Sequence, residues 1–208
     1  MKLILRTFFS FLFLALALTG CSDSNTPKDG DQYMTIAKPI SDMQGVYEVF
    51  SLSCGHCRSM ETMLPEIKKL AGVKDIRSVH VTFNESAQLA AFVYYAAAIQ
   101  SPNGEPSDKL TEQLFAYTQD TPKDTPMDKR KEMLNNLFAQ YKMNSPYQLT
   151  QTQQEEVFSK MDQAQKIIEA ANITSVPTFI VNGKYLVNTP AHKNLQDLAN
   201  TIKYLEAK

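Results

Sequence analysis

The sequence is poor in cysteine and histidine and carries no excess of positive charge. Three cysteines are too few for a disulfide-stapled fold, and with three histidines the sequence lacks the second ligand pair that a zinc site would need. The 21 basic and 22 acidic residues leave a formal net charge of −1 at pH 7, so nothing indicates a nucleic-acid partner. No internal repeat is visible. With 208 residues, 43% of them hydrophobic, the chain suffices for one domain with an insertion or for two small domains.

The first twenty residues indicate export. A basic start at residues 1–6 precedes an apolar run at residues 8–18, which is too short to span a membrane and predicts a signal peptide over residues 1–20. That segment ends in Leu18-Thr19-Gly20-Cys21, which resembles a bacterial lipobox and implies cleavage before Cys21, with diacylglycerol and palmitate attached. The alternative is ordinary cleavage, which leaves Cys21 as a free thiol.

The mature chain is expected in the periplasm, lipid-anchored to the inner or outer membrane of a bacterium. Removal of residues 1–20 takes away two basic residues, so the net charge becomes 19 minus 22, or −3. Residues 21–31 are polar and predict a flexible tether between the anchor and the fold. With Cys21 taken by lipid, only Cys54 and Cys57 remain in an oxidising space, and this pair is free to cycle.

The two remaining cysteines form the motif Cys54-Gly55-His56-Cys57, at the point where a strand-like run, residues 46–52, turns into a helical run. This spacing places both sulfurs in the first helical turn, with Cys54 exposed and Cys57 one turn inside. The helix N-terminus and His56 both favour a thiolate, so we expect Cys54 to be a nucleophile of lowered pKa. The main interpretation is a redox dithiol. The alternatives are a zinc half-site and two unreactive buried cysteines.

Apolar patterns in the sequence indicate the order of strands around this motif. They predict an edge strand at residues 32–36, a central strand at 46–52, and a second central strand, parallel to it, at 76–83. Between the last two, a helix over residues 54–70 contains Pro65, which predicts a kink. A hairpin with the two-residue turn Asn182-Gly183 and a final helix complete the chain.

Residues 84–165 are expected to be helical throughout. Ser107 caps one predicted helix, and Thr150 with Gln153 forms a capping box for another. The apolar stripes of these helices are expected to be core rather than a cofactor site; the first consists of Leu89, Phe92, Val93, Ala96 and Ile99. The predicted fold class is therefore α/β, a thioredoxin fold with an inserted α-helical domain: residues 32–83 and 166–208 form the thioredoxin-like domain, and residues 84–165 form the insertion.

From about residue 32 to residue 208 the chain resembles the DsbA family of periplasmic thiol:disulfide oxidoreductases. The resemblance rests on the following segments: Glu48-Val49-Phe50-Ser51 before the C-x-x-C motif, Val79-His80-Val81, Val176-Pro177, Val181-Asn182-Gly183-Lys184-Tyr185 and Ile202-Lys203-Tyr204-Leu205. It implies that Cys54 is the exposed nucleophile, that Cys57 is the buried resolving cysteine, and that His56 stabilises the thiolate.

Pro177 and Glu48 acquire expected roles from the same resemblance. Pro177 matches the family's cis-proline facing the disulfide, where the backbone of Val176 pairs with a bound substrate strand; the alternative is a plain proline at the start of a strand. Alternation along residues 46–52 places Glu48 on the face of Val46, where a carboxylate would be buried. The family has an acid there beneath the resolving cysteine, which implies proton exchange with Cys57. The alternative is that Glu48 reaches solvent at a sheet edge.

The implied activity is the introduction of disulfide bonds into exported proteins with free cysteines, by a monomer reoxidised by a membrane redox partner of the DsbB type. No cofactor or metal beyond the cysteine pair is expected. Two departures leave the redox poise open: Gly55 stands where the family has proline, and Ser78 stands where it commonly has lysine. The alternatives are a periplasmic disulfide reductase or isomerase, and a lipoprotein that binds unfolded exported chains. No role is assigned to His80 and His192.

Overall fold

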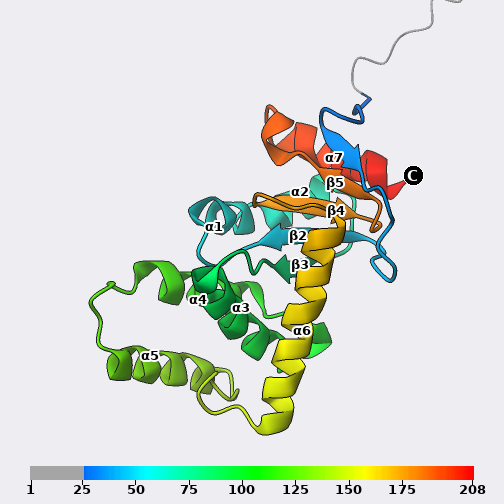
Figure 1. Ribbon diagram of the computed structural model, residues 1–208. Helices are drawn as coiled ribbons and strands as arrows, with labels where there is room; N and C mark the ends of the chain where they lie inside the picture. The colour runs from blue at the N-terminus through cyan, green and yellow to red at the C-terminus, as the bar shows by residue number, and fades with distance from the viewer. Residues whose placement is uncertain (1–25) are drawn as a thin grey trace, which may run out of the picture.

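One mixed sheet forms the centre of the protein. The computed structural model describes residues 26–208, so the predicted signal peptide and Cys21 lie outside the described residues. The sheet has five strands in the order β1-β5-β4-β2-β3, and Figure 1 labels β5, β4, β2 and β3 in that sequence. The strands are β1 (Tyr33–Thr35), β2 (Val46–Phe50), β3 (Ile76–His80), β4 (Thr178–Val181) and β5 (Tyr185–Val187). β2 and β3 run parallel, whereas the other neighbours are antiparallel. The predicted edge position of β1 and central position of β2 are confirmed.

Helices lie against both faces of this sheet. They are α1 (Gly55–Glu61), α2 (Leu64–Ala71), α3 (Glu85–Ala98), α4 (Asp108–Asp120), α5 (Met127–Gln140), α6 (Gln151–Ala170) and α7 (Leu195–Glu206). α2 and α7 build one hydrophobic core on one face of the sheet. α3 to α6 build a second core against the other face and are grouped together in Figure 1, with α5 farthest from the sheet. The domain division at residues 165 and 166 stays a prediction; α6 runs across it.

The second core gives the helical insertion its own apolar interior. Phe115 of α4 and Phe138 of α5 are fully buried, as is Tyr94 of α3. Full burial of one large apolar side chain contributes roughly 1.5–3 kcal/mol. Because Phe50 of β2 packs against both Tyr94 and Phe115, this interior is continuous with the sheet just ahead of the C-x-x-C motif.

The helix predicted over residues 54–70 is two helices, so the expectation of one kinked helix is wrong. α1 ends at Glu61 and α2 begins at Leu64, with Pro65 in its first turn. Proline lacks a backbone N–H, and its ring clashes with the carbonyl four residues earlier, which belongs to Glu61. A helix therefore cannot continue regularly through this point, whereas a new helix accepts proline in its first turn.

β3 lies at the edge of the sheet, so its predicted central position is wrong. Its free edge is covered by the helical insertion: Ser78 N donates to Glu105 Oε1 at 3.1 Å, and His80 N donates to Tyr95 Oη at 3.0 Å. Side chains thus satisfy backbone groups that a further strand would otherwise pair. The insertion thereby buries the end of β3 at Val79 and His80.

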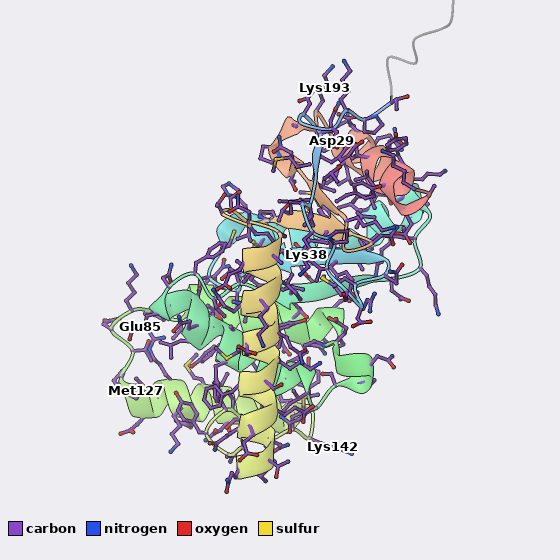
Figure 2. All side chains as sticks on the ribbon, turned by 45° about the vertical axis from the view of Figure 1, so that its right-hand side comes forward. Asp29, Lys38, Glu85, Met127, Lys142 and Lys193 are labelled. Carbon is purple, nitrogen blue, oxygen red and sulfur yellow. The ribbon has the colours of Figure 1, made fainter. Side chains whose placement is uncertain are left out.

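The stripe predicted as the core face of α3 is only partly buried. Leu89 is 65% exposed, whereas Ala91 and Tyr94 are buried. α3 is apolar around most of its circumference, so periodicity does not select one buried face. By contrast, the predicted caps are confirmed: Ser107 Oγ accepts from Leu110 N, and Thr150 and Gln153 form a capping box. Figure 2 shows another exposed apolar side chain, Met127, at the start of α5.

The hairpin between β4 and β5 turns at Asn182 and Gly183, as predicted. Both residues have positive φ, 53° and 62°, and Lys184 N donates to Val181 O at 3.0 Å. A Cβ atom at Gly183 would clash with the carbonyl oxygen of Ile40. Glycine is therefore required here by both conformation and space.

Candidate active site

Cys54 is the N-cap residue of α1, and its sulfur is the more accessible of the pair. Its Sγ accepts a hydrogen bond from Cys57 N at 3.2 Å, and its thiol lies 3.7 Å from the carbonyl oxygen of Val176. A backbone N–H and the positive end of the helix dipole both favour negative charge on a sulfur at this position. The site therefore suits a thiolate nucleophile at Cys54.

Cys57 lies in the interior, and both cysteines are free thiols in this structure. Its side chain is 0% exposed. Burial raises the pKa of the Cys57 thiol, and its hydrogen bond to the Cys54 sulfur and the nearby charge of Glu48 act in the same direction. The two sulfurs therefore differ in accessibility, and burial disfavours loss of the proton from Cys57.

The Val176-Pro177 peptide bond is cis and immediately precedes β4. The carbonyl of Val176 faces the Cys54 sulfur across the site. Sequence analysis predicted both the cis bond and this position, and the structure brings Val176, Pro177 and Cys54 together as expected. The predicted pairing of Val176 with a substrate strand stays a prediction.

Glu48 is buried in the middle of the sheet, as the strand pattern predicts. It is 1% exposed, and neither carboxylate oxygen has a hydrogen-bond partner within residues 26–208. It lies opposite Phe179 of β4 and Ser78 of β3, on the sheet face covered by α2. Burial, reinforced by the charges of Glu61 and Cys54, raises the pKa of Glu48 well above its usual value. The alternative in which Glu48 reaches solvent at a sheet edge is wrong.

A second group of acids lies beside this buried one. Glu61, Glu105 and Asp108 line a cavity of about 90 Å³ between the thioredoxin-like part and the helical insertion. Burial, together with the charge of Asp108, raises the pKa of Glu61 to about 7, although Lys68 opposes this effect. Burial also raises the pKa of Glu105, against its hydrogen bonds from Ser78 and Tyr94. A polar cavity of this size has room for several water molecules.

Neither Glu61 nor Glu105 was predicted as part of the site from the sequence. Glu61 follows Cys57 by four residues and so lies on the same side of α1, a signal that was available. Glu105 carried no comparable signal, since it reaches Ser78 from a loop 27 residues further along the chain.

The three histidines have different surroundings. His56 is exposed, and within residues 26–208 no hydrogen bond joins it to Cys54. His80 is fully buried: Nε2 accepts from Leu52 N at 2.8 Å, and Nδ1 donates to Val81 O at 2.8 Å. Burial lowers the pKa of His80 to about 4, so a neutral imidazole supports the loop ahead of Cys54. His192 hydrogen-bonds Thr201 Oγ1 at 2.9 Å.

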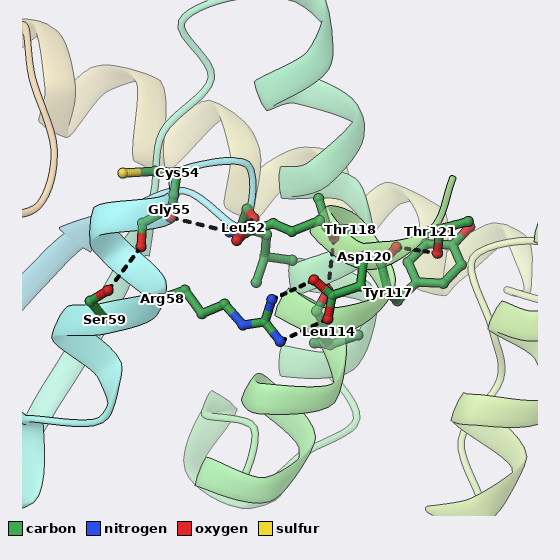
Figure 3. A network of polar contacts seen from close by, with 11 residues as sticks. Leu52, Cys54, Gly55, Arg58, Ser59, Leu114, Tyr117, Thr118, Asp120 and Thr121 are labelled. Atoms are coloured by element: carbon green, nitrogen blue, oxygen red, sulfur yellow. Dashed lines mark hydrogen bonds and ion pairs between the residues drawn. The ribbon is translucent and has the colours of Figure 1, made fainter. Parts of the chain in front are cut away.

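The end of α4 supplies further contacts to the same loop that sequence analysis did not find. The amide of Gln119 donates to the carbonyls of Leu52 and Cys54, and Asp120 pairs with Arg58 of α1, as Figure 3 shows. Gln119 and its partners are 65 and 67 residues apart in the chain, so no local pattern signals the contact.

The described part of the chain has neither a cluster of metal ligands nor a helix that could span a membrane. There, no cluster of three or more histidine, cysteine, aspartate or glutamate side chains is arranged to hold a metal ion. None of the helices between residues 26 and 208 combines the length and apolar character needed to cross a bilayer.

Comparison with known proteins identifies the family. A family model described as thioredoxin matches residues 43–203. The thiol:disulfide interchange protein DsbA of Escherichia coli strain K12 is 29% identical over 212 residues, covering 95% of this chain and 98% of the relative. DsbA of Salmonella typhimurium strain LT2 is 29% identical over 211 residues, with the same coverage.

Solved structures agree with the sequence relatives. DsbA from Xylella fastidiosa aligns with a TM-score of 0.67 and 21% identity, covering 87% of this chain and 96% of that one. Reduced DsbA1 from Neisseria meningitidis aligns with a TM-score of 0.54 and 25% identity, covering 88% and 94%. The predicted α/β thioredoxin fold with an inserted α-helical domain is thereby confirmed, and the chain belongs to the thioredoxin family as a DsbA-like member.

Proposed function

We propose that this protein is a thiol:disulfide oxidoreductase that introduces disulfide bonds into exported proteins through Cys54 and Cys57. The observation that carries the proposal is the asymmetry of the two sulfurs. Cys54 Sγ lies at a helix N-terminus and accepts the Cys57 N–H, whereas Cys57 is 0% exposed. An incoming thiolate can therefore reach only one sulfur of a disulfide formed between them. The names of the relatives support the same activity.

The exchange proceeds in two steps. A substrate thiolate attacks Cys54 Sγ of the disulfide, the bond between Cys54 and Cys57 breaks, and Cys57 leaves with the electron pair. A second substrate thiolate then attacks the substrate sulfur of the mixed disulfide and releases Cys54 as a thiolate. The substrate loses two electrons and gains a disulfide, and the enzyme gains two electrons and becomes a dithiol.

Glu48 supplies the proton that the first step requires. The departing Cys57 sulfur becomes negative in a buried place, where an unpaired charge is unfavourable. Glu48 is close enough for its charge to raise the pKa of the Cys57 thiol. Burial raises its own pKa well above the usual value and so favours its protonated form. Transfer of this proton to Cys57 leaves the site ready for reoxidation, in which the proton returns.

Substrate is held at the rim of the site. An extended substrate segment pairs with the backbone of Val176, whose carbonyl already faces Cys54, and Pro177 keeps that carbonyl beside the sulfur. This is recognition by strand addition, in which backbone groups supply the contacts. His56, exposed on the first turn of α1, adds positive charge that stabilises the Cys54 thiolate.

The compartment is proposed to be the periplasm, with lipid on Cys21 as the anchor. The lipobox-like sequence before Cys21 supports the anchor, and the DsbA relatives support export. We further propose that the protein acts as a monomer, that a membrane redox partner of the DsbB type reoxidises it, and that the cysteine pair is its only redox group.

Metabolic labelling with a lipid tag tests the anchor. We expect label on the intact chain and none after Cys21→Ala, with the variant released as a soluble and still redox-active protein. The absence of label on the intact chain would exclude lipid attachment at Cys21.

The activity is tested by mixing the oxidised protein with reduced, unfolded ribonuclease A. Remaining thiols are trapped with N-ethylmaleimide, and the disulfides of the ribonuclease are counted by mass spectrometry. We expect about one ribonuclease disulfide for each oxidised protein molecule consumed, because each molecule accepts two electrons. A Cys54→Ser variant is the matched control. Formation of no more disulfide than this control forms would refute the proposal.

A reductase or isomerase is the second candidate, and Ser78 favours it. Ser78 lies directly opposite Glu48 and brings no positive charge to the buried acid, and Gly55 departs from the family motif. The redox state of the protein in the cell separates the two: a mostly oxidised pair indicates an oxidase, and a mostly reduced pair indicates a reductase or isomerase. Replacement of both Cys54 and Cys57 by Ser without loss of biological activity would instead indicate a lipoprotein that binds unfolded exported chains.

A further inference from the structure

The last turn of α4 is hydrogen-bonded to the backbone that leads into the redox motif. Gln119 Nε2 donates two hydrogen bonds, to Leu52 O at 2.7 Å and to Cys54 O at 3.2 Å. Both hydrogens of one amide nitrogen are thereby used. The donor belongs to the helical insertion, whereas both acceptors belong to the loop between β2 and α1. The insertion is thus joined by hydrogen bonds to the residue that carries the nucleophile.

This loop is held from two directions. Leu52 is fully buried; its N–H donates to His80 Nε2 at 2.8 Å, and its carbonyl accepts from Gln119. Removal of either partner would leave a buried backbone group unsatisfied, which is destabilising. The conformation of the backbone two residues before Cys54 is therefore determined by one side chain from β3 and one from α4.

The neighbouring residue in α4 adds an ion pair. Asp120 binds Arg58 of α1 with two contacts, at 2.7 and 2.9 Å. Each partner shifts the pKa of the other, upward for Arg58 and downward for Asp120. In Figure 3 the Cys54 sulfur points away from this pair. The contacts of α4 therefore hold the loop and α1 while leaving the sulfur open on its other side.

The amide of Gln119 also affects the electrostatic potential at the sulfur. Carbonyl oxygens carry partial negative charge, and two of them close to Cys54 oppose a thiolate there. The N–H groups of Gln119 bring partial positive charge onto both oxygens and offset this effect. Loss of the amide would therefore make the surroundings of the Cys54 sulfur less favourable to negative charge.

We propose that Gln119 is a positioning residue of the redox centre, through which the helical insertion sets the reactivity of Cys54. The inference rests on the proposed function only in requiring that Cys54 be a reactive thiol. It assigns to the insertion a part in the chemistry besides contact with substrate.

The test compares two variants at this position. Gln119→Met keeps the length of the side chain and removes the donor, and Gln119→Glu places a carboxylate against two carbonyl oxygens. The control is Gln113→Glu, on the same helix. Gln113 Oε1 accepts from Tyr141 Oη, and a carboxylate preserves that bond while remaining apart from the redox loop.

Two readouts are measured on the full-length protein. They are the rate of Cys54 alkylation by iodoacetamide at neutral pH and the reduction potential from equilibration with glutathione. For Gln119→Met we expect alkylation to slow about threefold, which corresponds to part of the net value of one hydrogen bond, and the potential to become more negative. Gln119→Glu should show a larger fall, and Gln113→Glu should match the unaltered protein.

Unchanged alkylation rate and potential in Gln119→Met would overturn the proposal, even if its melting temperature falls, because a purely structural role predicts that result. Should the charged variant not fold, Gln119→Met carries the test alone. The proposed function fails differently: an unaltered protein that transfers no disulfide to substrate refutes that function, whereas the alkylation result bears on Gln119 alone.

Discussion

The surface of the redox site, at Cys54, and the interior beneath it, at Cys57 and Glu48, contain similar chemistry in opposite surroundings. At the turn, Cys54 has a donor on its sulfur and an open side facing Val176. One layer below, Cys57 is 0% exposed and Glu48 is 1% exposed, with no hydrogen bond to its carboxylate among the described residues. The upper layer favours a charged sulfur, whereas burial in the lower layer favours the protonated forms of Cys57 and Glu48. Burial, more than residue type, decides which sulfur is attacked by the substrate and which one leaves.

The comparison also explains why a buried acid is retained. An unpaired carboxyl in a sheet interior is destabilising by a few kcal/mol when it must ionise, and a hydrocarbon side chain would fill the space at less cost. A protonated Glu48 beside a sulfur that leaves as an anion gives that position a chemical use. The cavity lined by Glu61, Glu105 and Asp108 lies beside Ser78, the residue opposite Glu48.

The largest expected effect separates the two sulfurs completely. Cys54→Ser should abolish disulfide transfer, because the exposed nucleophile is lost. Cys57→Ser should form mixed disulfides that no second sulfur resolves, so adducts with exported proteins should accumulate on non-reducing gels. The Cys54→Ser variant is the control for trapping through Cys57. Equal trapping by the two variants would show that Cys54 is not the only sulfur that substrate reaches, and would contradict the difference between the two sulfurs.

Glu48→Gln should change how stability depends on pH. The folded pKa of Glu48 lies well above the ordinary value of 4.5, so between these values the folded state holds a proton that the unfolded state has lost. Its contribution is therefore fully present below pH 4.5 and is lost as pH rises toward the folded pKa, by about 1.4 kcal/mol per pH unit. Relative to the unaltered protein, the variant should therefore gain stability as pH rises from 5 to 6.

Urea unfolding at pH 5, 6 and 7 measures this difference. Glu85→Gln, on the exposed first turn of α3 (Figure 2), is the control and should follow the unaltered protein. Parallel curves for Glu48→Gln and the unaltered protein would mean that Glu48 is ionised in the folded state. The interior of the site would then not hold the proton that we assign to Glu48.

A weaker effect should appear in the acidic cavity. The pKa of Glu61 is raised to about 7 by burial and by Asp108, with a smaller contribution from Glu105. Glu105→Gln removes one negative charge, so the Glu61 carboxyl followed by carbon-13 NMR should titrate a fraction of a pH unit lower. Stability linked to Glu61 is lost as pH rises from 4.5 through 7, and in the variant this loss should end at a lower pH. Glu132→Gln on α5 is the control; an unmoved midpoint would show that Glu105 and Glu61 do not interact.

The parts of the site that were predictable are those encoded within a few residues. The C-x-x-C motif, the alternation that buries Glu48 and the Asn182-Gly183 turn are local patterns whose physical consequences are direct. Pro65 was correctly predicted to interrupt a regular helix. Whether the helix kinks or ends at such a residue depends on the packing of the following turn. This choice is made by tertiary contacts, and the chain ends α1 and begins α2.

The parts that were not predictable depend on contacts between distant segments. The side chains of Glu105 and Tyr95 cover the edge of β3. Nothing in the residues of β3 shows that side chains take the place of a neighbouring strand. Gln119 looks like any polar residue near the end of a helix until the fold brings it to Leu52. Positions of this kind are where a structure adds chemistry that periodicity and motif spacing do not contain.

The smallest expected effect concerns the ion pair between Arg58 and Asp120, which joins the upper layer to the insertion. Their side chains are 34% and 58% exposed, so water and salt screen the attraction. Asp120→Asn keeps the shape and one acceptor oxygen, and we expect the melting temperature to change by no more than about 3 °C. The change should shrink further in 1 M NaCl, and Cys54 alkylation should slow less than in Gln119→Met. If Asp120→Asn instead slowed alkylation as strongly as Gln119→Met, the charge on α4 would act on the sulfur directly. The difference between the two layers would then depend on long-range electrostatics as well as on burial.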